Sequence, residues 1–248
     1  MWDYPSPGRD PGGRAGRAKV TEGERVVAKV ISLEDVKRNP EVMAYLERSN
    51  EVMGALGYTE HSFRHVGLVS HIAHNIMAHL GYPQREAELA AVAGYLHDIG
   101  NVVSRLNHGQ IGAVIAGDIL RRMGLPIDEV AQVMGAIGNH DDDVGQPVSR
   151  ISAAILLGDK SDVHRTRVRN IDPATFDIHD RVNYAAEKSF VRVDEKEKTI
   201  TLELTVDTKI APVMEYFEIF LTRMVMCRRA ASFLGCNFEL SINEVRLL

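Results

Sequence analysis

The sequence predicts a mainly α-helical protein, in which a helical bundle is followed by a small α+β module. Apolar residues recur at helical spacing as far as about residue 170, and short stretches with Gly and Pro separate the helical segments. Apolar–polar alternation of period two, which is typical of strands, starts only after about residue 180. We therefore expect a disordered tail over residues 1–20, a helical domain over residues 21–180 and the α+β module over residues 181–248.

The composition is that of a soluble globular protein. Hydrophobic residues make up 45% of the chain, charged residues make up 25%, and the net charge is -5. A negative net charge gives no general attraction to nucleic acid or to acidic membranes. No apolar run approaches the roughly 20 residues that a membrane span needs, and no apolar signal core opens the chain. We expect a cytoplasmic protein in which Cys227 and Cys236 pack as small apolar side chains.

The N-terminal part of the chain is predicted to contain a short strand and three helices. Apolar alternation indicates a strand from Val26 to Ile31, and Ser32 is placed to cap a short helix after it. Pro40 begins a helix that runs to about Leu56. The third helix spans His61–Leu80, and Gly and Pro follow it.

Four further helices are predicted before the change of period. They are Gln84–His97, then His108–Met123 with Asn107 as its cap, then Glu129–His140 with Asp128 as its cap, and a helix that Ser149 begins and that continues beyond Asp159. If the last of these helices continues, Asp162 and Arg165 lie three residues apart on one face and can form an ion pair.

The C-terminal module is predicted to have the order strand, strand, helix, strand. The expected strands are Phe190–Val193, Thr199–Val206 and Asn237–Val245, with a polar hairpin turn between the first two and the helix Ala211–Leu234 before the third. The module contains no obvious catalytic cluster, so we expect the chemistry to lie in the helical domain. The apolar surface of its helix leaves a homodimer open, as an alternative to packing on its own strands.

Histidine and aspartate residues gather near the predicted helix ends. The dipeptide His97-Asp98 follows an Ala-rich helix, where neither side chain can be buried without a partner. A divalent metal ion is a partner for both, and imidazole with carboxylate suits iron, manganese, zinc and, less well, magnesium. A carboxylate can also bridge two ions, so Asp98 could lie between them. Upstream, His61 and His65 share a helix face, and position alone does not choose between them.

The order of these residues resembles that of the HD superfamily of metal-dependent phosphohydrolases. Leu96-His97-Asp98-Ile99-Gly100 is similar to the HDIG signature of that family, and the interval from His65 to Leu80-Gly81 is similar to its first motif helix, which favours His65 over His61. The words Asn107-His108-Gly109 and Gly138-Asn139-His140-Asp141 resemble the additional histidine motifs of binuclear members, and Gly158-Asp159-Lys160 resembles the closing aspartate motif. The resemblance covers about residues 57–170.

The resemblance implies a helical HD domain that binds two divalent transition metal ions. Iron or manganese is expected, with zinc, nickel or magnesium as alternatives. A metal-bound hydroxide would cleave a phosphomonoester or phosphodiester of a phosphorylated small-molecule substrate, with a nucleotide as the first choice. The implied metal ligands are His65, His97, Asp98, His108, His140 and Asp159, and the implied catalytic residues are His97 and Asp98. Apart from the resemblance, Lys160, Arg165 and Arg167 follow Asp159 closely and are candidate cations for the phosphate, with a solvated helix face as the alternative.

Two departures from the family pattern restrict this interpretation. Asn101 follows the HDIG signature where many relatives carry Lys, so a lysine contact to phosphate is missing there. Gly81-Tyr82-Pro83 has the letters found in relatives that cleave cyclic di-GMP, but it lies upstream of the His-Asp pair rather than downstream. Cyclic di-GMP is therefore not the first expected substrate.

Two other functions stay open at this point. The first is a di-iron HD-type oxygenase, which oxygen consumption and iron dependence would identify. The second is a non-catalytic nucleotide-sensing protein, which would bind its ligand without turnover. The complete set of ligand types favours the hydrolase over the sensor.

Overall fold

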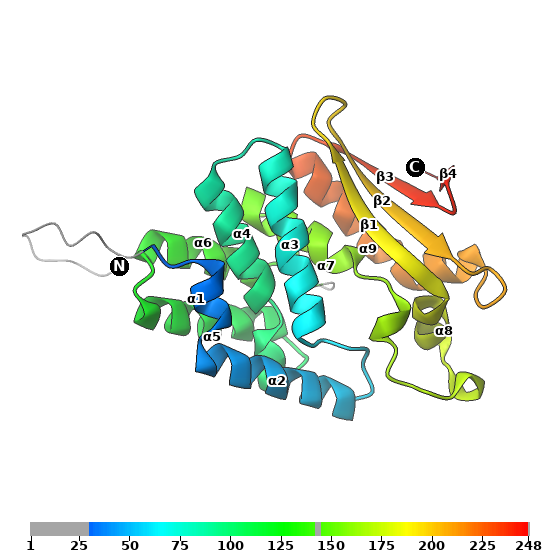
Figure 1. Ribbon diagram of the computed structural model, residues 1–248, viewed down its shortest axis with the longest axis horizontal. Coiled ribbons are helices and arrows are strands. Elements are labelled where there is room, and N and C mark those ends of the chain that lie inside the picture. The colour runs from blue at the N-terminus through cyan, green and yellow to red at the C-terminus, as the bar shows by residue number, and fades with distance from the viewer. Residues whose placement is uncertain (1–29, 142–144, 248) are drawn as a thin grey trace, which may run out of the picture.

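The structure is a computed structural model that describes residues 30–141 and 145–247 (Figure 1). The expected tail and most of the expected strand Val26–Ile31 lie outside the described residues, and Val30 and Ile31 are not in a strand. The predicted fold class is confirmed, because the molecule is mainly α-helical with one small sheet toward its C-terminal end.

Seven α-helices form the helical part of the described chain. They are α1 Leu33–Lys37, α2 Pro40–Ala55, α3 Phe63–His79, α4 Gln84–Leu96, α5 His108–Met123, α6 Ile127–Gly138 and α7 Arg150–Ser161, with the 3₁₀ turn η1 Ile99–Val102 between α4 and α5. Ser32 and Ser149 cap α1 and α7 as predicted. None of the helices in the described part of the chain is long and apolar enough to cross a bilayer.

Three details of the helix ends differ from prediction. Asn107 precedes α5 in the left-handed region, at φ 60°, and its side chain makes no capping bond. Helix α6 begins at Ile127 with Pro126 as its N-cap. Asp128 therefore lies inside the first turn and makes no capping bond. Helix α7 ends at Ser161, so the expected Asp162–Arg165 helical pair does not form.

Helices α3, α4 and α7 pack against one another at the centre of the bundle (Figure 1). The Ala-rich α4 is buried along most of its length, from Leu89 to Leu96. Gly94 lets α4 approach α3 closely, since a Cβ at this position would lie 3.0 Å from the Ser70 Cα. The Ser70 hydroxyl then donates to the Ala91 carbonyl across the same contact at 2.8 Å. This close approach fixes the end of α4, where His97 lies.

The turn after α4 is held just as tightly. A Cβ at Gly100 would collide with the His108 carbonyl oxygen and with the Gly112 backbone nitrogen, so only glycine fits between η1 and α5. From the other side, the Ser49 hydroxyl of α2 donates to the Ile99 carbonyl at 3.1 Å. The backbone of the HDIG segment is therefore clamped between two helices.

The C-terminal module is a four-stranded sheet with one long helix packed against it. Its elements are α8 Ile178–Ala185, β1 Ala186–Asp194, β2 Thr199–Val206, α9 Val213–Phe233, β3 Asn237–Ile242 and β4 Val245–Arg246, and the 3₁₀ turns η2 Arg165–Arg167 and η3 Pro173–Thr175 connect α7 to it. The strand order is β1-β2-β3-β4, with β1 and β2 antiparallel and β2 and β3 parallel. The predicted hairpin and helix are confirmed, whereas α8 was not predicted and the last strand divides into β3 and β4.

Helix α9 packs against both the sheet and helix α7 of the bundle (Figure 1). On β2 every second side chain is buried, beginning at Ile200, and α9 contributes the large buried side chains Tyr216 and Phe220. Helix α9 also packs on α7, which carries Asp159. The module is thus in direct contact with one of the helices that position the site.

Candidate metal centre

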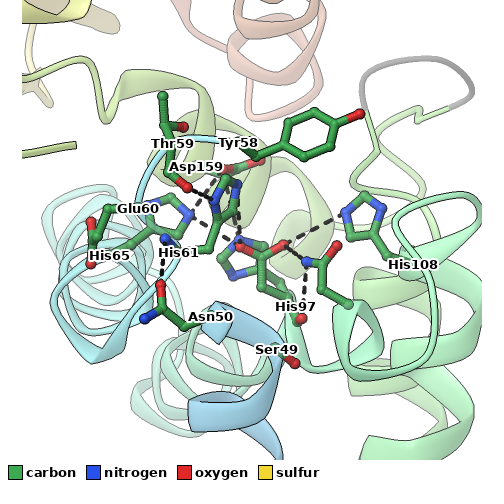
Figure 2. Close-up of polar contacts among 12 residues, drawn as sticks. Ser49, Asn50, Tyr58, Thr59, Glu60, His61, His65, His97, His108 and Asp159 are labelled. Atoms are coloured by element: carbon green, nitrogen blue, oxygen red, sulfur yellow. Dashed lines mark hydrogen bonds and ion pairs between the residues drawn. The ribbon is translucent and has the colours of Figure 1, made fainter. Parts of the chain in front are cut away.

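The predicted histidines and aspartates converge from five segments of the bundle. His65 lies on α3, His97 caps the end of α4, His108 begins α5, His140 follows α6, and Asp159 lies in the last turn of α7. Figure 2 shows the labelled side chains of His65, His97, His108 and Asp159 turned toward one centre. The four histidines and Asp98 are each at most 2% exposed.

Each of these four imidazoles is held by its Nδ1 atom. His97, His108 and His140 donate from Nδ1 to the backbone carbonyl three residues earlier, at 2.8, 3.1 and 2.6 Å. His65 instead contacts the Asp162 carboxylate, with 2.7 Å between Nδ1 and Oδ2. A carbonyl or a carboxylate only accepts, so the proton lies on Nδ1 and the Nε2 lone pair faces the centre.

The Asp98 carboxylate lies between two groups of histidines. Its Oδ2 atom is 3.5 Å from His65 Nε2 and 3.4 Å from His97 Nε2. Its Oδ1 atom is 3.6 Å from His108 Nε2, and that nitrogen is 3.1 Å from His140 Nε2. The two oxygens of one carboxylate therefore face different sets of nitrogens, which is the arrangement that a bridging ligand requires.

The buried atoms at the centre fit metal ions. Within the described part of the chain, His65 Nε2, His97 Nε2 and Asp98 Oδ2 are buried and have no hydrogen-bond partner. Buried polar atoms are normally satisfied, so three of them around one point fit a bound cation. Ligand atoms of His65, His97 and Asp159 lie within 4.8 Å of one another, as do those of His97, Asp98 and His140. Imidazole and carboxylate are donors that divalent transition metals accept.

Asp159 and Lys160 form a second pair at the same point. Asp159 Oδ1 faces His65 Nε2 at 3.4 Å, whereas Oδ2 accepts from the Lys160 ammonium at 2.6 Å. Lys160 is only 4% exposed. The structure thus brings Lys160 to the site, where it orients one carboxylate oxygen of Asp159 toward the histidines.

Electrostatics favour an ionised Asp98 and a neutral His140, the charge states that metal binding requires. Burial alone would raise the pKa of the Asp98 carboxyl, but the imidazoles around it, that of His97 foremost, hold this pKa well below 3.8. Burial lowers the pKa of His140 to about 3, with further lowering from His97 and His108. His97 shows the reverse balance: burial opposes its protonation, yet the carboxylates of Asp98 and Asp159 raise its pKa above 6.5. This negative field is the one that a cation would enter.

His61 also reaches the centre but is already engaged. Its Nε2 atom lies 4.0 Å from Asp98 Oδ2 and accepts from the Arg167 guanidinium at 3.3 Å, while Nδ1 donates to the Thr59 carbonyl at 2.7 Å. Arg167 is buried and also donates to the Glu60 and Asp162 carbonyls. The geometry therefore separates two histidines that sequence position could not, because His65 offers an unpartnered Nε2 and His61 does not.

Two supporting residues were missed from the sequence. Asp162 holds the His65 ring, and Asn101 donates from Nδ2 to Asp98 Oδ1 at 2.8 Å. Asn101, noted above for the absence of a lysine after the HDIG signature, here orients the Asp98 carboxylate instead. The sequence signal for both was proximity to a motif, since each lies three residues after a predicted ligand.

The structure does not bring Arg165 to the centre. Arg165 lies in η2 rather than on a continued α7, and its guanidinium pairs with Glu187 at 2.9 Å and lies over the Tyr184 ring. Arg105 is the closer cation, because its Nη1 atom lies 3.2 Å from His108 Nε2. A metal ion on that nitrogen would require the Arg105 side chain to move aside.

Comparison with known proteins identifies a family for part of the chain. A family model described as HD domain matches residues 62–175, from the N-cap of α3 to the end of η3. No curated protein matches the chain. The matched stretch contains all six residues predicted as metal ligands, together with Lys160 and Asp162.

Proposed function

Residues 62–175 are an HD domain, the domain of a superfamily of metal-dependent phosphohydrolases, and from this premise we propose that the protein hydrolyses a phosphate ester of a nucleotide with two divalent transition metal ions as cofactors. The observation that carries the proposal is the set of buried atoms without partners, His65 Nε2, His97 Nε2 and Asp98 Oδ2. A bound cation would give these buried atoms the partner that they otherwise lack.

The geometry supports a division of the ligands between two ions. His65, His97, Asp159 Oδ1 and Asp98 Oδ2 would hold one ion, since these atoms face one another across 3.4 to 3.7 Å. Asp98 Oδ1, His108 and His140 would hold the other. The mixture of imidazole and carboxylate favours iron or manganese, with zinc, nickel or magnesium as alternatives.

Bound ions of this kind lower the pKa of water and neutralise charge on a phosphate. The protein's own residues supply the orientation that this chemistry needs. The carbonyls and Asp162 keep the Nε2 lone pairs aimed at the centre, and Asn101 and Lys160 fix the carboxylates of Asp98 and Asp159. Arg105, whose guanidinium already reaches the cluster, is placed to bind a phosphate oxygen.

The experiment is a turnover assay after controlled metal loading. Metal-stripped protein is reloaded with manganese or ferrous iron and tested on a panel of nucleotides, with phosphate release and oxygen consumption measured in parallel. We expect phosphate or nucleotide release that depends on metal, no oxygen consumption, and loss of turnover in Asp98→Asn. Asp118→Asn, at an exposed aspartate of α5, is the matched control and should behave like the parent.

Other outcomes would contradict the proposal in different ways. Oxygen consumption without phosphate release would identify an oxygenase. Saturable nucleotide binding without any turnover would identify a sensor.

A further inference from the structure

A cavity of about 320 Å³ opens beside the metal centre, a size within the usual range of small-molecule sites. One wall comes from the HD domain and the segment before it, including Tyr58, His61, Arg105 and Arg167. His61 links the cavity to the centre, because its Nε2 atom is 4.0 Å from Asp98 Oδ2. Figure 2 shows Tyr58 and Thr59 along one side of the cluster.

The opposite wall comes from the C-terminal module. Asp180 and Asn183 of α8 and Phe220 and Arg223 of α9 line the cavity. Arg223 is held in place by stacking, with its guanidinium 4.8 Å from the centre of the Phe220 ring, and the Phe220 ring is itself buried. The module therefore presents a fixed cation and a carboxylate to the same cavity that leads to the metal centre.

The chemistry of the two walls is mixed rather than purely basic. Arg105, Arg167 and Arg223 donate hydrogen bonds, whereas the carboxylates of Asp177 and Asp180 only accept them. An inorganic phosphate uses mainly the donors, and a plain alkyl group uses neither kind. A group with several hydroxyl or amine donors, attached to an anionic ester, uses both.

Resting on the proposed function, we propose that α8 and α9 complete the active site and select the part of the substrate that does not react. Arg223 binds an acceptor or anionic oxygen of that part, and Asp180 accepts from its hydroxyl or amine groups. The chemistry shared by suitable ligands is a polyhydroxylated organic phosphate, which nucleotides and sugar phosphates both provide. The half-exposed ring of Tyr58, over which the Arg105 guanidinium lies at 5.5 Å, is placed to pack on a flat base or a sugar face.

The test compares two substrates that present the same reacting group. Uridine 5′-monophosphate p-nitrophenyl ester carries a ribonucleoside with its 2′- and 3′-hydroxyl groups, whereas bis(p-nitrophenyl) phosphate carries no nucleoside. Arg223→Gln is compared with Arg228→Gln, which makes the same charge change at an exposed position of the same helix. We expect Arg223→Gln to lower kcat/KM for the nucleoside ester by about ten- to a hundred-fold, mainly through KM. The loss on the small ester should be at least about tenfold smaller, and Arg228→Gln should match the parent on both.

Conservative variants separate a binding role from damage to the fold. Arg223→Lys should recover part of the loss because it keeps the charge, and Asp180→Asn should lower the same substrate preference without any change to α9. If Arg223→Gln keeps the parent's preference between the two esters, or if Arg228→Gln loses it equally, the inference is wrong.

A binding measurement without turnover distinguishes this inference from the proposed function. Calorimetry with the four ribonucleoside 5′-monophosphates and with glucose 6-phosphate decides between a nucleoside and a sugar. Arg223→Gln should weaken the binding of whichever compound binds the parent by tenfold or more. Binding with this Arg223 dependence but no hydrolysis would overturn the proposed function and keep the inference. Hydrolysis of both esters with no binding of any of these compounds would overturn the inference and keep the hydrolase.

Discussion

Replacing Asp162 by asparagine tests whether the residues behind the ligands set metal affinity. Asp162 is 1% exposed and its Oδ2 atom accepts from His65 Nδ1 at 2.7 Å. The same oxygen accepts from Arg64 at 2.8 Å and lies 3.7 Å from Arg167 Nε. Asparagine keeps the shape and one acceptor but removes the charge that orients and polarises the His65 ring.

The expected magnitude follows from these contacts. Loss of a carboxylate behind a metal-bound histidine typically costs ten- to a hundred-fold in metal affinity, or about 1.4 to 2.7 kcal/mol. The metal-free protein should also lose about 2 kcal/mol of unfolding free energy, because the buried Arg167 loses a charged neighbour but keeps its carbonyl partners. Asp162→Asn should therefore fold, bind metal more weakly and retain all six proposed ligands.

The assay is a competition titration of manganese or zinc against a chromophoric chelator. The exposed Asp118→Asn variant serves as the control for removal of a carboxylate. Parent-like metal affinity in Asp162→Asn would refute the reasoning, because it would mean that the His65 ring needs no charged partner. An equal loss in both variants would show that general electrostatics, rather than the His65 contact, sets the affinity.

Other consequences of the geometry can be measured separately. His65→Ala should lose most bound metal by elemental analysis, whereas His61→Ala should keep the metal, because of these two histidines His65 alone offers an unpartnered Nε2 atom. Gly100→Ala should lower the free energy of unfolding by about 3 kcal/mol or more in urea titrations, since a Cβ at this position has no room. Gly135→Ala in α6 is the control, because Gly135 has open space around it, and this change should alter stability by less than about 1 kcal/mol. Glu129→Gln should lower the free energy of unfolding by about 1 to 2 kcal/mol at neutral pH, because Arg85 on α4 pairs with Glu129 and lowers its pKa below 4.5. That difference is present above pH 4.5 and should shrink as the pH falls below it, because the folded parent then loses this stabilisation.

Much of the fold could be predicted because local signals and tertiary packing agree. Ser32, Ser149 and Pro40 mark helix starts in the sequence and in the structure. The segment Thr199–Val206, whose side chains alternate with period two, forms a strand with one buried face. Prediction failed where a local signal competed with another. Asp128 resembles a cap, but Pro126 already begins the helix, and the polar α8 has too few apolar residues to stand out.

The site was predictable where motifs carry it and not where distant residues meet. Spacing placed His97, Asp98, His108, His140 and Asp159 near helix ends, which is where the structure has them. Arg165 was placed on a continued α7, but the chain leaves the helix at Asp162 to reach the module. Arg223 lies far along the chain from every motif, and only the packing of α9 on α7 brings it to the cavity. No pattern within the sequence reports such a contact.

We propose that the His–Asp centre binds two metal ions that the reaction needs, and a single titration can decide this. Metal-stripped protein is loaded stepwise with manganese, and bound metal per chain and phosphodiester turnover are measured on the same samples. We predict that turnover rises as occupancy approaches two ions per chain, and that Asp98→Ala, which removes the carboxylate facing both histidine groups, binds neither ion tightly and shows no turnover. Full metal occupancy in Asp98→Ala, or full turnover by the stripped parent, would contradict the claim.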